Sequence, residues 1–279
     1  MLFRSNLVLG GEVTIAANVS VAARAGSSLI AMMQITPSMS RFTLDGLAYL
    51  SIMASLDAEV NGHLQLILNH GAGFVEGEVA GNIKVAGGAI LVGASWEAEG
   101  QLNWHLGTDF NELQGMVSLD IMGFGGGSGV GAGFYVGCDA PKSRAWVLVG
   151  ADERYNLNMS SMPDRLTGVY GFVYVHQGIN LYIISGGYDL YVGLGAFLNT
   201  GIGVPYVVGN LGGRIYGDIL GGLVSAAAYF NWQLIGGAPI PIPIGFEGSV
   251  GLEACVLWVI CGSVDLTVGL NSAQGFYIE

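Results

Sequence analysis

The stretch that decides the fold is residues 42–68, FTLDGLAYLSIMASLDAEVNGHLQLIL. Its even-numbered positions are almost all apolar, while its odd-numbered positions carry polar side chains such as Asp45, Glu59 and His63. Side chains that alternate with a period of two project from opposite faces of a β-strand, whereas a helix repeats every 3.6 residues. The stretch therefore predicts β-structure with one apolar and one polar face.

The same alternation runs through most of the chain, with apolar odd positions at 7–23 and apolar even positions at 246–270. A two-residue hairpin loop joins positions three apart, so it switches the apolar set from odd to even. Such a switch occurs at Gly87-Gly88, and glycine suits the positive φ of a hairpin turn. Glycine and polar residues predict further hairpins at 25–28, 71–73, 177–178, 186–187 and 221–222. These spacings indicate an all-β fold, an antiparallel meander of long amphipathic strands.

Two runs, 42–68 and 246–270, keep a single parity for about 25 residues, roughly 80 Å if fully extended. A hairpin with an odd-numbered loop preserves parity, so we expect a hairpin inside each run. In the second run the polar face is interrupted by Leu257 and Val259, which places the tip at 256–260.

Cys255 and Cys261 would then lie opposite each other and could form a disulfide, which would imply an oxidising compartment. If the strand runs straight through, they lie about 20 Å apart and cannot bond. Cys138 is expected to be an unpaired structural thiol.

Longer irregular segments at 107–114, 137–143, 151–167, 199–213 and 236–245 are expected to be loops at the ends of the sheet. No composition break marks a linker, so residues 1–279 are predicted to form a single β-barrel or β-sheet domain, either complete or excised from a larger protein. Residues 1–11 show no signal-peptide pattern.

The composition is 52% hydrophobic and only 11% charged, against a usual charged share of about a quarter. The net charge is −12, and the basic residues are scattered, so nucleic acid is not an expected partner. No stretch approaches the roughly 18 uninterrupted apolar residues of a membrane helix. Any membrane contact must therefore be made by strands.

Candidate chemistry is sparse. The glycine-rich stretch 123–133 is followed by no helix pattern, so it indicates a strand and not a dinucleotide site. Acidic residues recur two apart, as in Glu97 and Glu99, which favours an acidic, wetted strand face over paired catalytic acids. The histidines show no ligand spacing; they are His63, His70, His105 and His176. We expect no catalytic residue, no cofactor and no metal.

All the tryptophans lie on apolar parities; they are Trp96, Trp104, Trp146, Trp232 and Trp258. Trp96 and Trp104 are about 26 Å apart at strand rise, or roughly 20 Å along the axis of a tilted barrel. This separation suits two aromatic girdles flanking an apolar band, although large aromatics can also simply fill a core. By strand pattern alone, the chain resembles outer-membrane β-barrels as a class. The resemblance implies a closed or nearly closed β-barrel in the bacterial outer membrane or at the cell surface, with lipid or detergent on its apolar face.

Two functional hypotheses follow. The first is a non-enzymatic envelope β-barrel that serves as a membrane scaffold, an anchor or a narrow conduit. The second is a soluble or surface-exposed structural module, or a lipid-holding tube, with protein partners in a larger envelope assembly. The second is favoured by apolar residues on the polar face, such as Leu47, Tyr49 and Phe172, because they argue against a wide aqueous channel. Pro239, Pro241 and Pro243 would also prevent one strand edge from pairing, unless they form a stiff loop.

Overall fold

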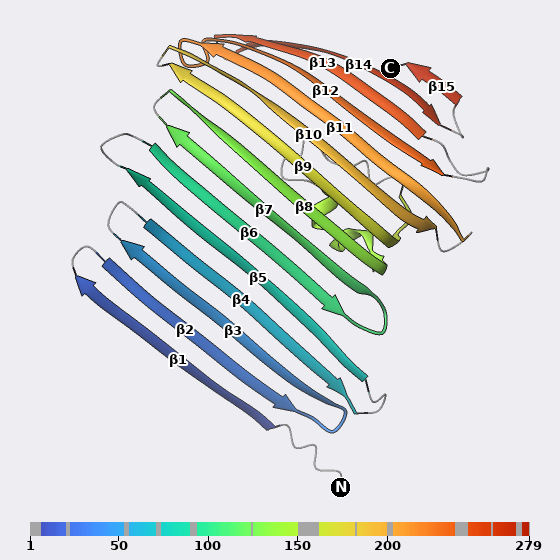
Figure 1. Cartoon of the computed structure of the whole chain (residues 1–279). Helices are drawn as coiled ribbons and strands as arrows, with labels where there is room; N and C mark the ends of the chain where they lie inside the picture. Colours follow the sequence, from blue (N-terminus) through green and yellow to red (C-terminus); the bar gives the residue numbers. More distant parts are fainter. Residues whose placement is uncertain are drawn as a thin grey trace. The chain divides into compact units, whose positions relative to one another are not determined.

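A computed structural model describes residues 7–20, 23–52, 56–70, 74–89, 94–123, 125–149, 162–181, 183–199, 203–237, 245–257, 259–271 and 275–278. These residues form an antiparallel meander in which the strand order follows the chain (Figure 1). The first eight strands are β1 (Leu7–Ser20), β2 (Ala23–Ile35), β3 (Met39–Ile52), β4 (Leu56–Asn69), β5 (Phe74–Ala89), β6 (Ala94–Leu106), β7 (Asn111–Gly123) and β8 (Gly126–Pro141). The remaining strands are β9 (Arg165–Leu181), β10 (Ile184–Asn199), β11 (Val204–Ile219), β12 (Val224–Gly237), β13 (Gly245–Val256), β14 (Ile260–Asn271) and β15 (Gly275–Ile278).

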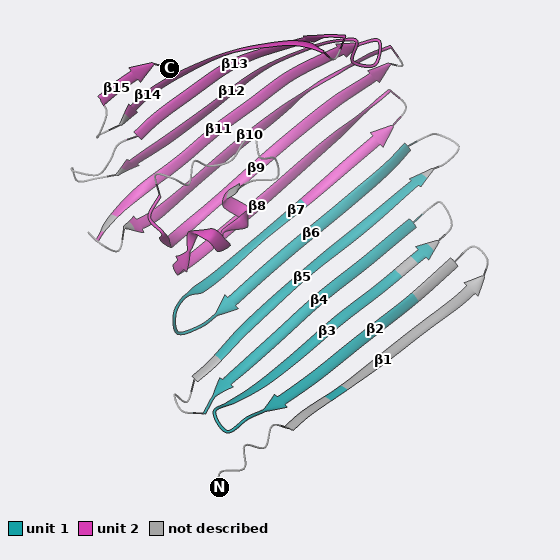
Figure 2. Cartoon of the chain, turned by 180° about the vertical axis from the view of Figure 1, so that it is seen from behind, with its two compact units in different colours: residues 1–117 teal, residues 118–279 magenta. Residues whose placement is uncertain are grey.

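The all-β meander of long strands is confirmed. In the described part of the chain, however, hydrogen bonds do not close the sheet into a barrel. The chain divides into two compact units, residues 1–117 and 118–279 (Figure 2). A single domain spanning the whole chain stays a prediction.

Both long single-parity runs are hairpins, as predicted. Strand pairing continues to Ile52 opposite Leu56 in the first and to Val256 opposite Ile260 in the second. Each turn contains three residues, an odd number, so the apolar parity is kept. The predicted turn at 221–222 also falls between strands, and Leu220, Gly221 and Gly222 have positive φ there. The turn predicted at 71–73 lies outside the described residues. The glycine-rich stretch lies largely in β8, as expected of a strand.

The Gly87-Gly88 turn is wrong in position although the parity switch is real. Both glycines lie inside β5, and pairing continues to Ala89 opposite Ala94. The glycine at 87 instead makes room for an aromatic ring, because a Cβ there would lie 2.8 Å from the indole of Trp96. Close approach to a neighbouring side chain, and not turn geometry, explains this glycine.

The hairpins predicted at 25–28, 177–178 and 186–187 are also wrong, because these residues lie within β2, β9 and β10. A Cβ on Gly187 would collide with the carbonyl oxygen of Gln177 on the adjacent strand, so this glycine too serves close packing. Most of the loop predicted at 199–213 is β11, and β8 continues through 137–141 with a bulge between Gly137 and Ala140. Of the loops predicted at 107–114, 151–167 and 236–245, residues 107–110 and 162–164 lie between strands, as expected. Residues 111–114, 165–167, 236–237 and 245 instead belong to strands, and the rest lie outside the described residues. Pro239, Pro241 and Pro243 lie outside the described residues.

The core of residues 118–279 lies on one face of β8–β11. Along these strands burial alternates residue by residue, so that Tyr135, Tyr170 and Tyr191 are buried while neighbours such as Val192 are exposed. Two 3-10 helices, η2 (Lys142–Arg144) and η3 (Trp146–Val149), follow β8, and η3 packs against it (Figure 2). Val147 and Leu148 on η3 are also buried. This face is therefore filled by aromatic side chains and by the chain's own connecting segment.

Candidate functional site

The apolar stripe of the strands is exposed in both units. In the described part of residues 1–117, exposed large apolar side chains include Leu29, Val60, Leu66, Ile83 and Leu102. In residues 118–279 they include Val173, Leu194, Ile215, Leu234 and Leu252, with Ile215 69% exposed. Exposed apolar patches larger than a few hundred Å² are rare on monomeric soluble proteins and mark contact surfaces. The stripe is therefore the main candidate functional surface.

The tryptophans divide into three groups. Trp96, Trp104 and Trp232 lie on strands and are exposed, so their rings belong to the stripe. Trp146 lies in η3, not on a strand, so its predicted place on the stripe is wrong. Residues 145–149 lie between β8 and β9 in a 3-10 helix and its flank, so they do not continue the alternation of a strand. The indole of Trp258 lies outside the described residues.

The face opposite the stripe in residues 118–279 contains a buried hydroxyl network. The Tyr170 hydroxyl donates to Asn210 Oδ1 at 2.7 Å, and it lies 2.8 Å from the hydroxyl of Tyr191. Phe172 stacks on Tyr191 with ring centroids 5.4 Å apart. A Cβ on Gly193 would collide with the Tyr170 hydroxyl, so glycine at this position lets the network form. Alternation alone predicts aromatic residues such as Phe172 on this face, but it does not predict the hydrogen bonds that join the tyrosines.

The polar face of residues 1–117 carries the predicted pairs of carboxylates, and its described acidic side chains are partly or fully exposed except for Glu112, which is buried. Lys84 lies opposite Glu99 in the strand register and forms an ion pair with Glu97 at 2.7 Å. The side chain of His63 lies 2.5 Å from Asp45 Oδ1. No group of three or more His, Cys, Asp or Glu side chains in the described ranges could hold a metal ion. The contacts on this face are ion pairs and hydrogen bonds within single strands and between neighbouring strands.

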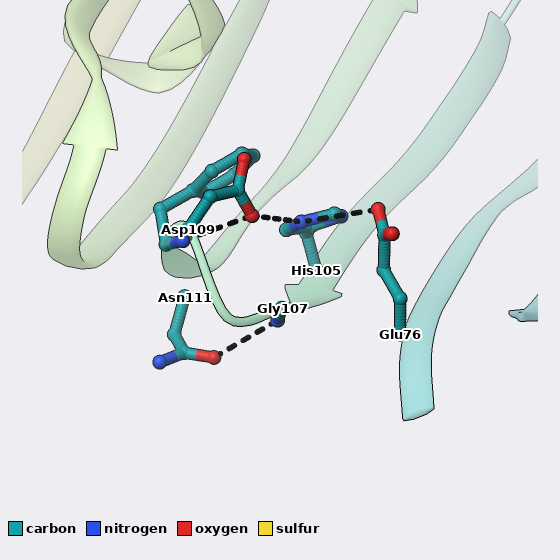
Figure 3. Close-up of polar contacts among 6 residues, drawn as sticks. Glu76, His105, Gly107, Asp109 and Asn111 are labelled. Carbon is teal, nitrogen blue, oxygen red and sulfur yellow. Dashed lines mark hydrogen bonds and ion pairs between the residues drawn. The ribbon is translucent and has the colours of Figure 1, made fainter. Parts of the chain in front are cut away.

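His105 has the most unusual environment of the histidines (Figure 3). The side chain is buried, and its ring stacks on Phe110 with a centroid separation of 4.1 Å. Its Nε2 lies 3.8 Å from Glu76 Oε1 and 3.9 Å from Asp109 Oδ1 (Figure 3). Neither ring nitrogen has a hydrogen-bond partner within the described residues. His105 thus packs as an aromatic ring that ties the 107–110 turn to β6, and two carboxylates are close enough to pair with it when it is protonated.

The odd position of His105 places it on the polar face of its strand, where a solvated or hydrogen-bonded side chain is expected. That expectation is wrong, because the ring is buried and neither nitrogen has a hydrogen-bond partner among the described residues. Phe110, five residues further along the chain, covers the ring because the β6–β7 turn folds back. Gly107 donates its backbone N–H to Asn111 Oδ1 at 3.1 Å and to the Phe110 carbonyl oxygen at 3.0 Å (Figure 3). These bonds fix the turn that brings Phe110 onto His105.

The other histidines make ordinary contacts. His70 Nε2 lies 2.8 Å from Ser40 Oγ, and His176 Nε2 lies 3.2 Å from Asp120 Oδ1.

Cys255 and Cys261 face each other across the β13–β14 hairpin with their sulfurs bonded, and Cys138 is an exposed free thiol.

No described helix is long and apolar enough to cross a membrane. No protein-family model, no curated protein and no solved structure matches the chain.

Proposed function

We propose that this chain is a non-enzymatic β-sheet protein of a bacterial envelope membrane, in which the exposed stripe contacts lipid and the protein serves as a scaffold, an anchor or a narrow conduit. The single observation that carries the proposal is the exposure of the stripe, including Trp96, Trp104 and Trp232. In a soluble protein these side chains would form the core. Transfer of one Leu or Ile side chain from water into an apolar phase contributes about 1.5–3 kcal/mol when burial is complete.

The conduit, if one exists, is narrow beside residues 118–279. The face opposite the stripe carries Tyr135, Tyr170 and Phe172, and η3 packs on the same part of the sheet. Wide porins keep this face polar and wetted. Scaffold and anchor roles therefore agree better with the packing than a wide pore does.

We further propose that the sheet closes into a barrel. β15 pairs only with Val268–Asn271 of β14, which leaves Ile260 to Thr267 without a second strand neighbour among the described residues. Free backbone N–H and C=O groups are not tolerated in hydrocarbon, so this edge needs a partner. β1 is the other edge strand in the strand order, so a closed barrel would give this edge β1 as its neighbour.

Detergent dependence tests the membrane proposal. The purified full chain is expected to remain monodisperse in detergent and in vesicles, and to aggregate when the detergent is removed. A chain that stays monodisperse without detergent or lipid would instead support a soluble structural module.

Cysteine cross-linking tests closure. In a Cys138→Ser background, Val264→Cys on the stripe face of β14 is combined with a series of single cysteines on the same face of β1, such as Val13→Cys, Ile15→Cys and Ala17→Cys. Oxidation is expected to cross-link one register and to give a fast-migrating monomer on unheated gels. The matched control pairs Val264→Cys with Ser27→Cys on β2, which is not an edge strand. Cross-links only between two chains would indicate pairing of copies instead of closure.

A further inference from the structure

The hairpin tips at one end of residues 118–279 are apolar. They are the connections β7–β8, β9–β10, β11–β12 and β13–β14, and three of them lie side by side in Figure 1. Their exposed side chains are Ile121, Met122, Leu181, Ile183, Ile219, Leu220, Leu257, Val259 and Ile260. Val259 is 84% exposed. Turns that face water are normally built from Gly, Asn, Asp, Ser and Pro, so these tips have the wrong composition for water.

Charge is sparse around the same tips: the nearest carboxylates, Asp120 and Asp218, directly precede Ile121 and Ile219 and contact His176 and Ser185 of neighbouring strands. The sequence contains no Asp, Glu, Lys or Arg at 121–138, 166–188, 219–246 or 254–264. The β8–β9 connection lies at the other end of the strands and carries ion pairs, Lys142 with Asp164 at 3.1 Å and Arg165 with Asp139 at 2.8 Å. The unit is therefore charged at one end and apolar at the other.

The backbone of the tips is hydrogen-bonded from one hairpin to the next. Leu220 donates its N–H to the carbonyl oxygen of Ile183 at 2.6 Å, and Leu257 donates to that of Leu223 at 2.6 Å. Turn residues exposed to water can bond water instead. Bonds between neighbouring turns are what a hydrocarbon environment requires, because unpaired backbone groups are costly there.

The distance from Trp232 to the hairpin tips agrees with a hydrocarbon environment at the tips. Trp232 lies on the exposed face of β12, eight residues after Val224 at the tip end. Eight residues span about 26 Å along a strand, less than the roughly 30 Å thickness of a hydrocarbon core. Tryptophan concentrates at membrane interfaces, so a tip this far from an interfacial Trp232 reaches the far side of the apolar layer but does not pass beyond it.

We infer that these tips, exemplified by Leu220 and Val259, lie in the hydrocarbon layer of a lipid membrane, which the strands enter from the charged end. This inference rests on the proposed membrane function and adds to it the orientation of the strands and the position of their ends. The occupant is lipid acyl chain, because the turn residues themselves carry no charge and the backbone N–H groups of Leu220 and Leu257 are already hydrogen-bonded.

Site-specific fluorescence tests the inference. The full chain, in a Cys138→Ser background and without reductant, is labelled with an environment-sensitive dye at Leu220→Cys or Val259→Cys and reconstituted in phosphatidylcholine vesicles. Matched controls carry the dye at Leu194→Cys on the stripe or at Ser143→Cys in the charged connection. Both tip labels are expected to emit at shorter wavelength than the Ser143 label, to be quenched several-fold less by aqueous iodide, and to be quenched by brominated lipid.

The possible failures are distinguishable. If iodide quenches the tip labels as strongly as the Ser143 label while the Leu194 label stays protected, the tips lie in water, and only this inference is overturned. If the Leu194 label is also quenched by iodide, the membrane proposal itself fails. Tip labels protected from iodide but untouched by brominated lipid would show a protein partner at the tips and would overturn the inference.

Discussion

Cys255 and Cys261 lie directly opposite each other on β13 and β14, with Cα atoms 4.1 Å apart and their sulfurs bonded. They bracket the apolar tip that contains Leu257 and Val259, and they are six residues apart in sequence. A covalent link across so short a loop limits how far the tip can open.

Thiol titration is expected to count this bond. The chain has three cysteines, so a denatured sample without reductant should show one reactive thiol, at Cys138, and a reduced sample three. The double variant Cys255→Ser, Cys261→Ser should lower the free energy of unfolding by about 2 kcal/mol, because the unfolded chain regains loop entropy. Cys138→Ser is the control and should change little. Three reactive thiols without reductant would contradict the bond.

A charge on the stripe should be costly if the stripe meets lipid. Leu194→Arg on β10 is expected to lower the free energy of unfolding by about 2–4 kcal/mol, measured by urea titration in vesicles, because arginine near the bilayer midplane is poorly solvated. Ser263→Arg, on the polar face of β14, is the matched control. On a surface that meets water both changes would stay within about 0.5 kcal/mol, and that result would argue against lipid contact.

The buried hydroxyl of Tyr170 should contribute measurably to stability. Tyr170→Phe removes its bond to Asn210 and its contact with the Tyr191 hydroxyl, and should cost about 1–3 kcal/mol of unfolding free energy. Tyr229→Phe makes the same chemical change where the hydroxyl donates to Asp265 on an exposed face. The expected cost there is smaller, within about 1 kcal/mol. Equal costs would mean that burial does not strengthen the network.

Glycine at 193 should be required for packing. Gly193→Ala places a methyl group against the Tyr170 hydroxyl and Asn210 Oδ1, both buried, and should destabilise the protein by about 1–3 kcal/mol. Gly262→Ala on β14 is the control, because a Cβ there has no atom within 4 Å. That change should be neutral or stabilising by up to about 1 kcal/mol, since it restricts the unfolded chain.

Phe110 should protect the 107–110 turn. Phe110→Ala removes the ring that stacks on His105, and the protection of the Gly107 amide against hydrogen exchange is expected to fall about tenfold, equivalent to about 1.4 kcal/mol. Thr108→Ala alters an exposed residue of the same turn and should leave that amide unchanged. An unchanged Gly107 amide in Phe110→Ala would show that the stacking does not hold the turn.

Alternation in the sequence was a good guide to strands but a poorer guide to turns. It correctly predicted the hairpins inside 42–68 and 246–270, because parity depends only on the number of residues in each loop. The turns predicted from Gly87 and Gly187 were wrong. At these positions the missing Cβ leaves space for the Trp96 ring or for a neighbouring backbone. Glycine permits both a turn and a close approach, and only the neighbouring strand reveals which one applies.

The sequence predicted the apolar stripe of the candidate surface but not its apolar hairpin tips. The stripe and its tryptophans follow from parity, except for Trp146, which lies in a connection where parity has no meaning. The apolar tips were missed, although the long uncharged segments around them, such as 219–246, were a visible signal. Their significance depends on which turns share an end of the sheet, and that requires the strand order.

By itself, the sequence determined that the chain forms antiparallel strands with one apolar face, because a period of two assigns each side chain to a face without knowledge of its neighbours. Only the tertiary structure decided that this face is exposed, that aromatic side chains fill the opposite face of β8–β11, and that His105 is buried beneath Phe110. Burial depends on what packs against a face, and those partners come from residues distant in sequence.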